Sequence, residues 1–190
     1  MQKIGITGGI GSGKSLVCTI FEKLGFPVFY SDLEAKRILL EDLNVKSQVI
    51  SLFGNEAYSV EGLNRKLIAN LIFSNEELKF KLNSIIHPVV RENFENWSII
   101  QKAKFVFNEA AILFETGSYK NFDKTILVTA PLSIKIERVI KRDQCSKEEV
   151  VQRMNNQWSD EKKIELADYV IINDDKSSLL FQIDQLLSKL

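Results

Sequence analysis

The residues with the clearest chemical meaning stand near the start of the chain, where positions 8–15 read GGIGSGKS. This run fits the pattern G-x-x-x-x-G-K-[ST], in which a glycine-rich loop turns successive backbone N–H groups toward phosphate oxygens. We expect Lys14 to reach the β- and γ-phosphates of a nucleoside triphosphate and Ser15 to place its hydroxyl on Mg²⁺. The residues predicted to cradle the phosphates are Gly8, Gly9, Ile10, Gly11, Ser12, Gly13, Lys14 and Ser15.

The sequence on either side gives this loop the strand–loop–helix context that the motif requires. Lys3–Thr7 has the apolar residues of a buried strand, and Lys14–Leu24 has apolar residues at helical spacing. The start of that helix contributes a dipole that favours phosphate. In the alternative interpretation the glycines only form a tight turn, but four glycines within six positions are more than a turn needs.

Farther along the chain, apolar runs alternate with helical stretches, which predicts an α/β fold with a parallel sheet in a three-layer arrangement. Two long connections interrupt this alternation: 31–102 has helical patterns and no clear strand, and 141–167 is charged and helix-forming. Because ligands bind outside the carboxyl ends of parallel strands, we expect these connections to provide an acceptor-binding region and a mobile lid. The expected strands are Lys3–Thr7, Phe26–Tyr30, Lys104–Asn108, Thr125–Thr129 and Tyr169–Asn173.

A carboxylate follows the second expected strand, where Phe29–Asp32 ends the strand and opens a helix. At the carboxyl edge of the strand that comes next after the phosphate loop, Asp32 could lie beside the phosphates. The local sequence also supports a structural role, because Ser31 with Glu34 forms a capping box and an aspartate in the first helical turn complements the dipole. Both interpretations of Asp32 stay open on these residues alone.

Arginines gather around the second long connection. Arg138 and Arg142 are four residues apart in one expected helix, so they share a face. Residues 146–149 have the form of a cap for a further helix, which carries Arg153. A helical hairpin with arginines on its inner side suits a lid that neutralises donor phosphates. The alternative is a solvated helix with exposed pairs such as Glu149 with Arg153.

The single histidine, His87, precedes Pro88 at the end of an apolar stretch that we expect to be helical over 78–86. Pro88 suits the first turn of a following helix, which makes His87 a junction residue with local hydrogen bonds. Trp97 and Trp158 are expected in the core or in a cleft wall rather than as base-stacking platforms.

With 190 residues the chain has the size of one domain, with room for an inserted lid. Its 25 basic and 25 acidic residues give a formal net charge of zero, which gives no electrostatic support for nucleic-acid binding. Cys18 and Cys145 belong to no metal-ligand pattern and are expected as reduced thiols. The sequence has no signal-peptide pattern and no apolar run long enough for a bilayer, so it favours a cytoplasmic enzyme.

In their combination and order, these motifs resemble the dephospho-coenzyme A kinase family, whose members phosphorylate the ribose 3′-hydroxyl of dephospho-CoA in the last step of coenzyme A synthesis. The resemblance covers nearly the whole chain. It rests on IGITGGIGSGKS, SDLEAKR, IIHPVVRE at 85–92, ILFE at 112–115, ERVIKRD, RMNNQ at 153–157 and ADYVIIND. Many kinases share the phosphate loop, so the order of the motifs carries the resemblance.

The resemblance implies a single P-loop kinase domain over 1–190 with an adenylate-kinase-like fold. It comprises a five-stranded parallel sheet between helices, a helical acceptor-binding region within 31–102 and a lid within 138–160. ATP and Mg²⁺ are the implied cofactors and dephospho-CoA is the implied partner. The expected protein is a monomer or weak homo-oligomer that binds neither membranes nor nucleic acid.

By position, the resemblance also implies roles for single residues. Asp32 would be the catalytic carboxylate, orienting or deprotonating the acceptor hydroxyl. Lys14 would hold the donor phosphates, and Arg138 and Arg142 would stabilise the transferred charge. The further residues implied at the site are Leu16 and Asn173 for ATP, His87 and Glu115 for the acceptor, and Glu109 for the Mg²⁺ hydration shell.

The chain departs from the family pattern at several positions. Tyr30 stands in place of the first carboxylate of a D-A-D run, and Ala111 stands in place of a proline. Leu16 occupies a position where threonine is common, and Asp175 one where glycine is usual. These changes leave the phosphate loop and Asp32 intact, so they bear on the acceptor pocket more than on the reaction.

Two other functions are compatible with the phosphate loop. One is another small-molecule kinase of the same fold, such as a nucleoside or nucleoside-monophosphate kinase. The other is a nucleotide-dependent switch protein that binds partner proteins. The sequence disfavours the switch because no N-K-x-D guanine-reading element follows a later strand, and residues 173–176 have the wrong order.

Overall fold

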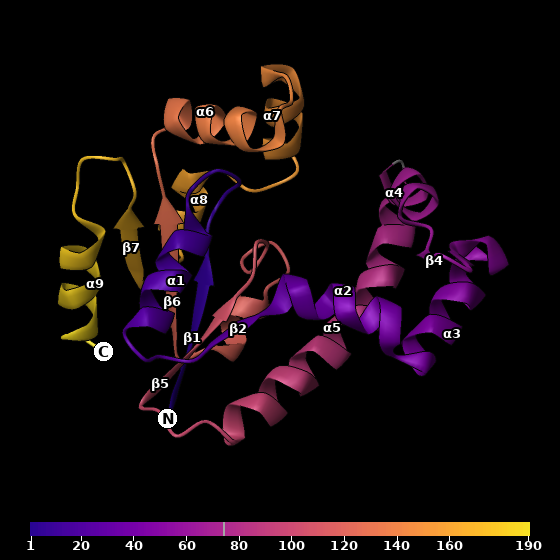
Figure 1. Cartoon of the computed structure of the whole chain (residues 1–190), viewed down its shortest axis with the longest axis horizontal. Coiled ribbons are helices and arrows are strands. Elements are labelled where there is room, and N and C mark those ends of the chain that lie inside the picture. The colour runs from indigo at the N-terminus through magenta and orange to yellow at the C-terminus, as the bar shows by residue number, and fades with distance from the viewer. Residues whose placement is uncertain (74) are drawn as a thin grey trace. The chain divides into compact units, whose positions relative to one another are not determined.

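A computed structural model describes residues 1–73 and 75–190, which form two compact units (Figure 1). The core unit comprises Met1–Tyr30 and Gln101–Leu190. The helical unit comprises Ser31–Ile100, which corresponds to the region 31–102 that the sequence predicts to be helical. Each unit has its own cluster of buried apolar residues.

Five parallel strands form the sheet of the core unit in the order β2-β5-β1-β6-β7, which confirms the predicted sheet. Their carboxyl ends share one edge, because Glu109 pairs in register with both Ile6 and Tyr30. The largest shift in bounds is at β2, which begins two residues later than expected because Pro27 has no N–H to donate to a ladder. The strands are β1 (Gln2–Thr7), β2 (Val28–Tyr30), β5 (Phe105–Glu109), β6 (Lys124–Thr129) and β7 (Tyr169–Ile172).

Helices and a loop segment cover the two faces of this sheet. On one face Ile4 and Ile6 pack into a cluster with residues of α1 and α9, in which Phe21 stacks on Phe107 with ring centroids 4.1 Å apart. Gly5 lies on the other face, where a Cβ would stand 2.7 Å from Leu113. The helices of the core unit are α1 (Lys14–Lys23), α6 (Leu132–Asp143), α7 (Lys147–Met154), α8 (Asp160–Ile164) and α9 (Leu179–Leu187), with a 3₁₀ turn η2 (Ser118–Asn121).

The helical unit is built around a small apolar core. Ile38, Val49, Ile68 and Ile86 are buried there, one from each of its four α-helices. It also contains a hairpin of two-residue strands, which the sequence did not predict because such strands are too short to show a period. The elements are α2 (Ser31–Glu41), α3 (Leu43–Phe53), η1 (Asn55–Ala57), β3 (Tyr58–Ser59), β4 (Gly62–Leu63), α4 (Arg65–Phe73) and α5 (Glu76–Ile99).

The expected helix junction at His87 is wrong. Helix α5 continues through Pro88, so His87 lies in the middle of a helix of 24 residues. Proline removes one hydrogen bond from the helix interior. Apolar packing on both sides of the proline opposes this loss, since Ile86 and Phe94 are both buried. Tertiary packing, rather than the local proline signal, decides the course of the chain here.

Among the residues that the structure describes, no helix is both long enough and apolar enough to cross a membrane.

His87 gives the helical unit a testable pH dependence. Burial, with a smaller contribution from Arg91, lowers the pKa of His87 below the ordinary value of 6.5. The unfolded chain therefore takes up a proton at His87 more readily than the folded chain, so the folded state loses stability as pH falls through the ordinary value. His87→Gln, neutral at every pH, should weaken this loss. Urea unfolding of both proteins at about pH 8 and about pH 5 would measure the fall in the free energy of unfolding. An equal fall in the two proteins would show that His87 is not the group responsible.

Candidate active site

A cavity of about 500 Å³ lies over the loop that joins β1 to α1. Every residue of the predicted phosphate loop lines it. Helix α6 borders it through Arg138, Val139 and Arg142, and the remaining lining residues are Ala111 and Gln157. The carboxyl end of the sheet, the start of α1 and α6 therefore meet at one concave site, as is expected of ligand sites in open α/β sheets.

The glycines of this loop are required by close approach and by backbone conformation. Gly11 and Gly13 have φ angles of 80° and 84°, which side chains rarely adopt. A Cβ on Gly11 would overlap the backbone carbonyl of Lys135, and one on Gly13 would overlap the Asn173 amide. At Gly8 a Cβ would overlap the Val128 carbonyl. These glycines do more than form a turn, because they let the loop pack against three other segments of the core unit.

Lys14 points from the loop to the edge of the sheet. Its ammonium forms a buried ion pair with Glu109, the last residue of β5. The structure thus brings together two residues that the sequence placed at the site for different reasons, the loop lysine and the carboxylate assigned to Mg²⁺. Within the described residues, no group of three or more His, Cys, Asp or Glu could hold a metal ion.

Cys18 lies one turn of α1 below Lys14 and is fully buried. Burial raises the pKa of its thiol to about 12, and the nearby Glu109 adds to the effect. Cys18 therefore stays protonated and acts as a small apolar residue in the core under the site.

Arg138 is fully engaged with the protein. One guanidinium nitrogen donates to the backbone carbonyls of Gly11 and Ser12, at 3.4 Å each. The other donates to the backbone and side-chain oxygens of Asn173 and to Asp175, at 3.0, 3.3 and 2.5 Å. The Asn173 amide in turn donates to the Ser12 carbonyl at 2.9 Å. Arg138 and Asn173 together fasten the loop to the segment that follows β7.

Asp175 has a positive φ of 62° at a position where the family pattern has glycine. Aspartate tolerates this left-handed conformation better than most residues, and the ion pair with Arg138 holds it there. The side chain at position 175 thus supplies Arg138 with a carboxylate partner.

Arg142, one turn after Arg138, is more exposed and lines the cavity. Its guanidinium binds the neighbouring carboxylate of Asp143, which also accepts from Arg153 at 2.8 Å. The Arg142 hydrogen bond is the main reason that the pKa of Asp143 lies below its ordinary value. The predicted cap of α7 is confirmed, since Ser146 and Glu149 form a full capping box. Arg153, for which the alternative interpretation named Glu149 as a partner, forms its ion pair with Asp143.

Glu115 has a structural environment inside the core unit. Its Oε1 accepts a hydrogen bond of 3.0 Å from the backbone N–H of Trp158. The same oxygen lies 2.8 Å from the Lys163 ammonium, which is fully buried. The Lys163 contact is an ion pair without hydrogen-bond geometry. Glu115 thereby ties the segment after β5 to the segment that joins α7 to α8.

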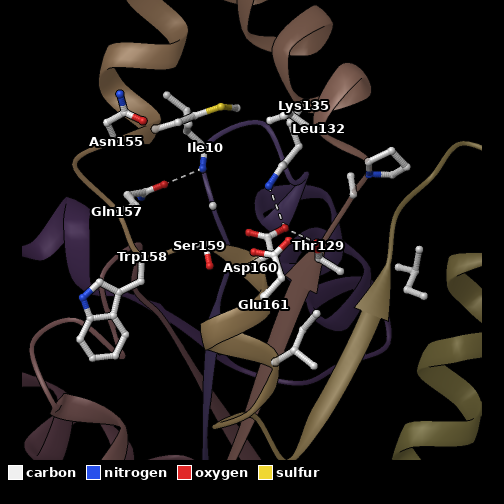
Figure 2. A pocket seen from close by; sticks show the side chains of 16 residues that line it. Ile10, Thr129, Leu132, Lys135, Asn155, Gln157, Trp158, Ser159, Asp160 and Glu161 are labelled. Atoms are coloured by element: carbon white, nitrogen blue, oxygen red, sulfur yellow. Dashed lines mark hydrogen bonds and ion pairs between the residues drawn. The ribbon is translucent and has the colours of Figure 1, made fainter.

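Three polar residues near the loop were missed by the sequence analysis: Lys135, Gln157 and Asp160. They surround Gly9, whose added Cβ would stand 3.3 to 3.7 Å from their polar atoms. Figure 2 shows them in a second cavity of about 650 Å³. Trp158 is in its wall, as expected, with Lys162 stacked 3.4 Å from the ring centroid. Gln157 ends the RMNNQ motif, but nothing in the sequence assigns it a role at the loop, and no motif marks Lys135 or Asp160, because their partners are far away in the chain.

Asp32 and His87 belong to the helical unit. Asp32 is half-buried in the first turn of α2, and Glu34 in the same turn accepts hydrogen bonds from Arg37 and Asn93. Arg37 is the main reason that the pKa of Glu34 lies below its ordinary value. His87 is half-buried on α5. The remaining predicted ATP residue, Leu16, is half exposed on α1.

Comparison with known proteins places this arrangement in a family. The family model of dephospho-CoA kinase matches residues 2–178. A dephospho-CoA kinase of Bacteroides fragilis is 41% identical over 187 residues, covering 98% of this chain and 91% of its own length. One of Chlorobium chlorochromatii is 36% identical, with coverages of 94% and 88%.

Solved structures of kinases resemble this chain as well. Dephospho-CoA kinase from Campylobacter jejuni has a TM-score of 0.68 at 30% identity, covering 98% of this chain and 97% of its own. Shikimate kinase from Acinetobacter baumannii shares the fold, with a TM-score of 0.58 at 15% identity. The match covers 100% of this chain and 92% of the shikimate kinase. With its phosphate loop, parallel sheet and this extent of similarity, the chain belongs to the dephospho-CoA kinase family.

Proposed function

We propose that this protein transfers the γ-phosphoryl group of ATP to the ribose 3′-hydroxyl of dephospho-CoA, giving coenzyme A and ADP. The observation that carries the proposal is the cavity over residues 8–15, where loop amides, Lys14 and Arg142 gather at the carboxyl end of the sheet. Family membership supports the choice of acceptor.

The residues around this cavity fit a triphosphate. The loop lines the cavity, so its N–H groups other than those of Ile10 and Ser12, which bond within the protein, can turn to phosphate oxygens, and the start of α1 adds its dipole. Lys14 has one anionic partner, Glu109, and a donor phosphate would give its ammonium a second. Bound Mg²⁺ would neutralise charge on the β- and γ-phosphates, with Ser15 as a ligand and Glu109 beside its water shell.

The two lid arginines have different tasks in this proposal. Both terminal nitrogens of the Arg138 guanidinium bind protein oxygens, so Arg138 holds the loop and the segment after β7 together. Arg142 is exposed, is bound to its neighbour Asp143 and lines the cavity, so it can exchange that partner for a phosphate oxygen. We therefore assign charge stabilisation during transfer to Arg142 and positioning to Arg138.

Asp32 stands two residues after Tyr30, the end of β2. We propose that its carboxylate orients the acceptor hydroxyl and takes up its proton, and that the helical unit, with His87, binds the acceptor. Glu115, with its buried Lys163 partner, supports the segment after α7 instead of meeting the acceptor directly.

We further propose that ATP and dephospho-CoA are the protein's partners in the cytoplasm, and that the chain acts as a monomer or weak homo-oligomer. The free thiols of Cys18 and Cys145 fit a reducing compartment. The balanced charge of the sequence gives no support for a nucleic-acid partner.

The acceptor decides between this function and its competitors. In the presence of ATP and Mg²⁺, dephospho-CoA should stimulate ADP formation far more than AMP, adenosine or shikimate, with coenzyme A as the product. Coupled ADP detection and mass spectrometry of the product would measure this. Preferential phosphorylation of AMP would replace the proposed acceptor while keeping the kinase class, and acceptor-independent hydrolysis would favour the switch protein.

Arg142→Ala should lower kcat/KM for ATP by about 10- to 100-fold, since a hydrogen bond to a charged group is lost. Lys141→Ala is the matched control, because Lys141 is an exposed cation on the same helix that does not line the cavity. Steady-state kinetics of both variants, with circular dichroism to verify the fold, provide the measurement. Equal kinetics for the two variants would place Arg142 on a merely solvated face.

Asp32→Asn separates the catalytic from the structural interpretation, because it keeps size and position in α2 while removing the charge. A catalytic carboxylate predicts a fall in kcat of about 10²-fold, the lower part of the range for a general base, because a loose transition state needs little early proton removal. ATP affinity and melting temperature should change little. Glu41→Gln, which removes an exposed charge from the same helix, is the control. A variant that melts earlier yet keeps near-normal turnover would show that Asp32 is structural.

A further inference from the structure

Gln157 lies between the two cavities of the core unit and lines both of them. Its side-chain oxygen accepts a hydrogen bond of 2.9 Å from the backbone N–H of Ile10, as the dashed line in Figure 2 shows. The two residues are 147 positions apart in sequence. This bond joins the segment between α7 and α8 to the phosphate loop.

The segment that carries Gln157 is anchored on both sides. On one side the backbone N–H of Trp158 donates to the Glu115 carboxylate, which also pairs with the buried Lys163. On the other side Asp160 accepts from the Thr129 hydroxyl and from the Lys135 ammonium, the latter at 2.7 Å. These anchors restrict where the Gln157 side chain can reach, so its bond to Ile10 is a built contact rather than a chance surface encounter.

The Ile10 amide is bound from outside the loop. The Ser12 N–H bonds back to the Gly9 carbonyl within the loop, whereas the Ile10 N–H points out of the loop to Gln157. Glycines on both sides of Ile10 make this part of the backbone conformationally free, so an acceptor held by another segment restricts the positions that it can take. The side chain of Gln157 therefore supplies an interaction that the loop cannot provide for itself.

We propose that Gln157 is a positioning residue, which holds the phosphate loop through the Ile10 amide in the shape that receives the donor triphosphate. The proposal rests on the proposed function in taking ATP as the donor. In this proposal the contact orders the loop before nucleotide binds, so less conformational entropy is lost when the phosphates arrive. The contact also makes loop order depend on the segment that ends the lid.

Amide hydrogen exchange of nucleotide-free protein tests the contact directly, and ATP titration and kinetics test its consequence. Gln157→Met keeps the length of the side chain and removes the oxygen that accepts the Ile10 hydrogen bond. The rate of hydrogen exchange at the Ile10 amide should then rise at least about tenfold. Both the Kd and the KM for ATP should rise about three- to tenfold. The kcat and the KM for dephospho-CoA should stay within about twofold, because the variant loses one neutral hydrogen bond to the loop that is proposed to bind ATP. Asn156→Met, at an exposed neighbouring position, should leave all of these values unchanged.

Gln157→Glu provides a second variant that keeps a hydrogen-bond acceptor. Exchange at Ile10 should stay slow, while the added negative charge beside the phosphates should weaken ATP binding. Unchanged hydrogen exchange at Ile10 in Gln157→Met would overturn the proposal. Tighter ATP binding in that variant would also overturn it, because it would show that Gln157 competes with phosphate.

Failure of the proposed function would look different. If wild-type protein binds ATP but does not phosphorylate dephospho-CoA, the proposed function fails, while hydrogen exchange and ATP titration still decide the role of Gln157.

Discussion

The active site depends on how closely the phosphate loop approaches its neighbours. At Gly8, Gly11 and Gly13 the loop backbone touches β6, α6 and the segment after β7 so tightly that a single methyl group would overlap them. Close packing of this kind fixes the course of the loop backbone along the cavity that it lines. It also requires that the three neighbouring segments stay fixed, because a shift of any one of them would move the loop.

The polar contacts around the loop serve that requirement. Arg138 and Asn173 bind its carbonyl oxygens, Glu109 binds its lysine, and Gln157 binds the Ile10 amide. Carbonyl oxygens that are held by donors from the protein side orient the opposite, N–H side of the same peptides toward the ligand. This arrangement explains how a loop rich in glycine, which is the most flexible residue, can form a defined anion site.

The sequence was sufficient for the features that depend on local pattern. The strands, the loop at residues 8–15 and the capping box at Ser146 all have short-range signals, and the structure confirms them. It was not sufficient where distant residues decide the outcome. Pro88 carries a local signal for a helix boundary, but apolar packing on both sides keeps α5 continuous. Lys135 and Asp160 lie 25 positions apart, and nothing in their spacing predicts that they meet beside Gly9.

The buried thiol of Cys18 has a consequence for the chemical resistance of the protein. Burial raises the pKa of this thiol to about 12, so it stays protonated at neutral pH. Oxidants and alkylating agents react with thiolates, and this thiol is covered by the core as well as protonated. Cys18, one turn of α1 from Lys14, should therefore resist oxidation, and electrophilic inhibitors aimed at the phosphate loop would need a reactive group elsewhere in the chain.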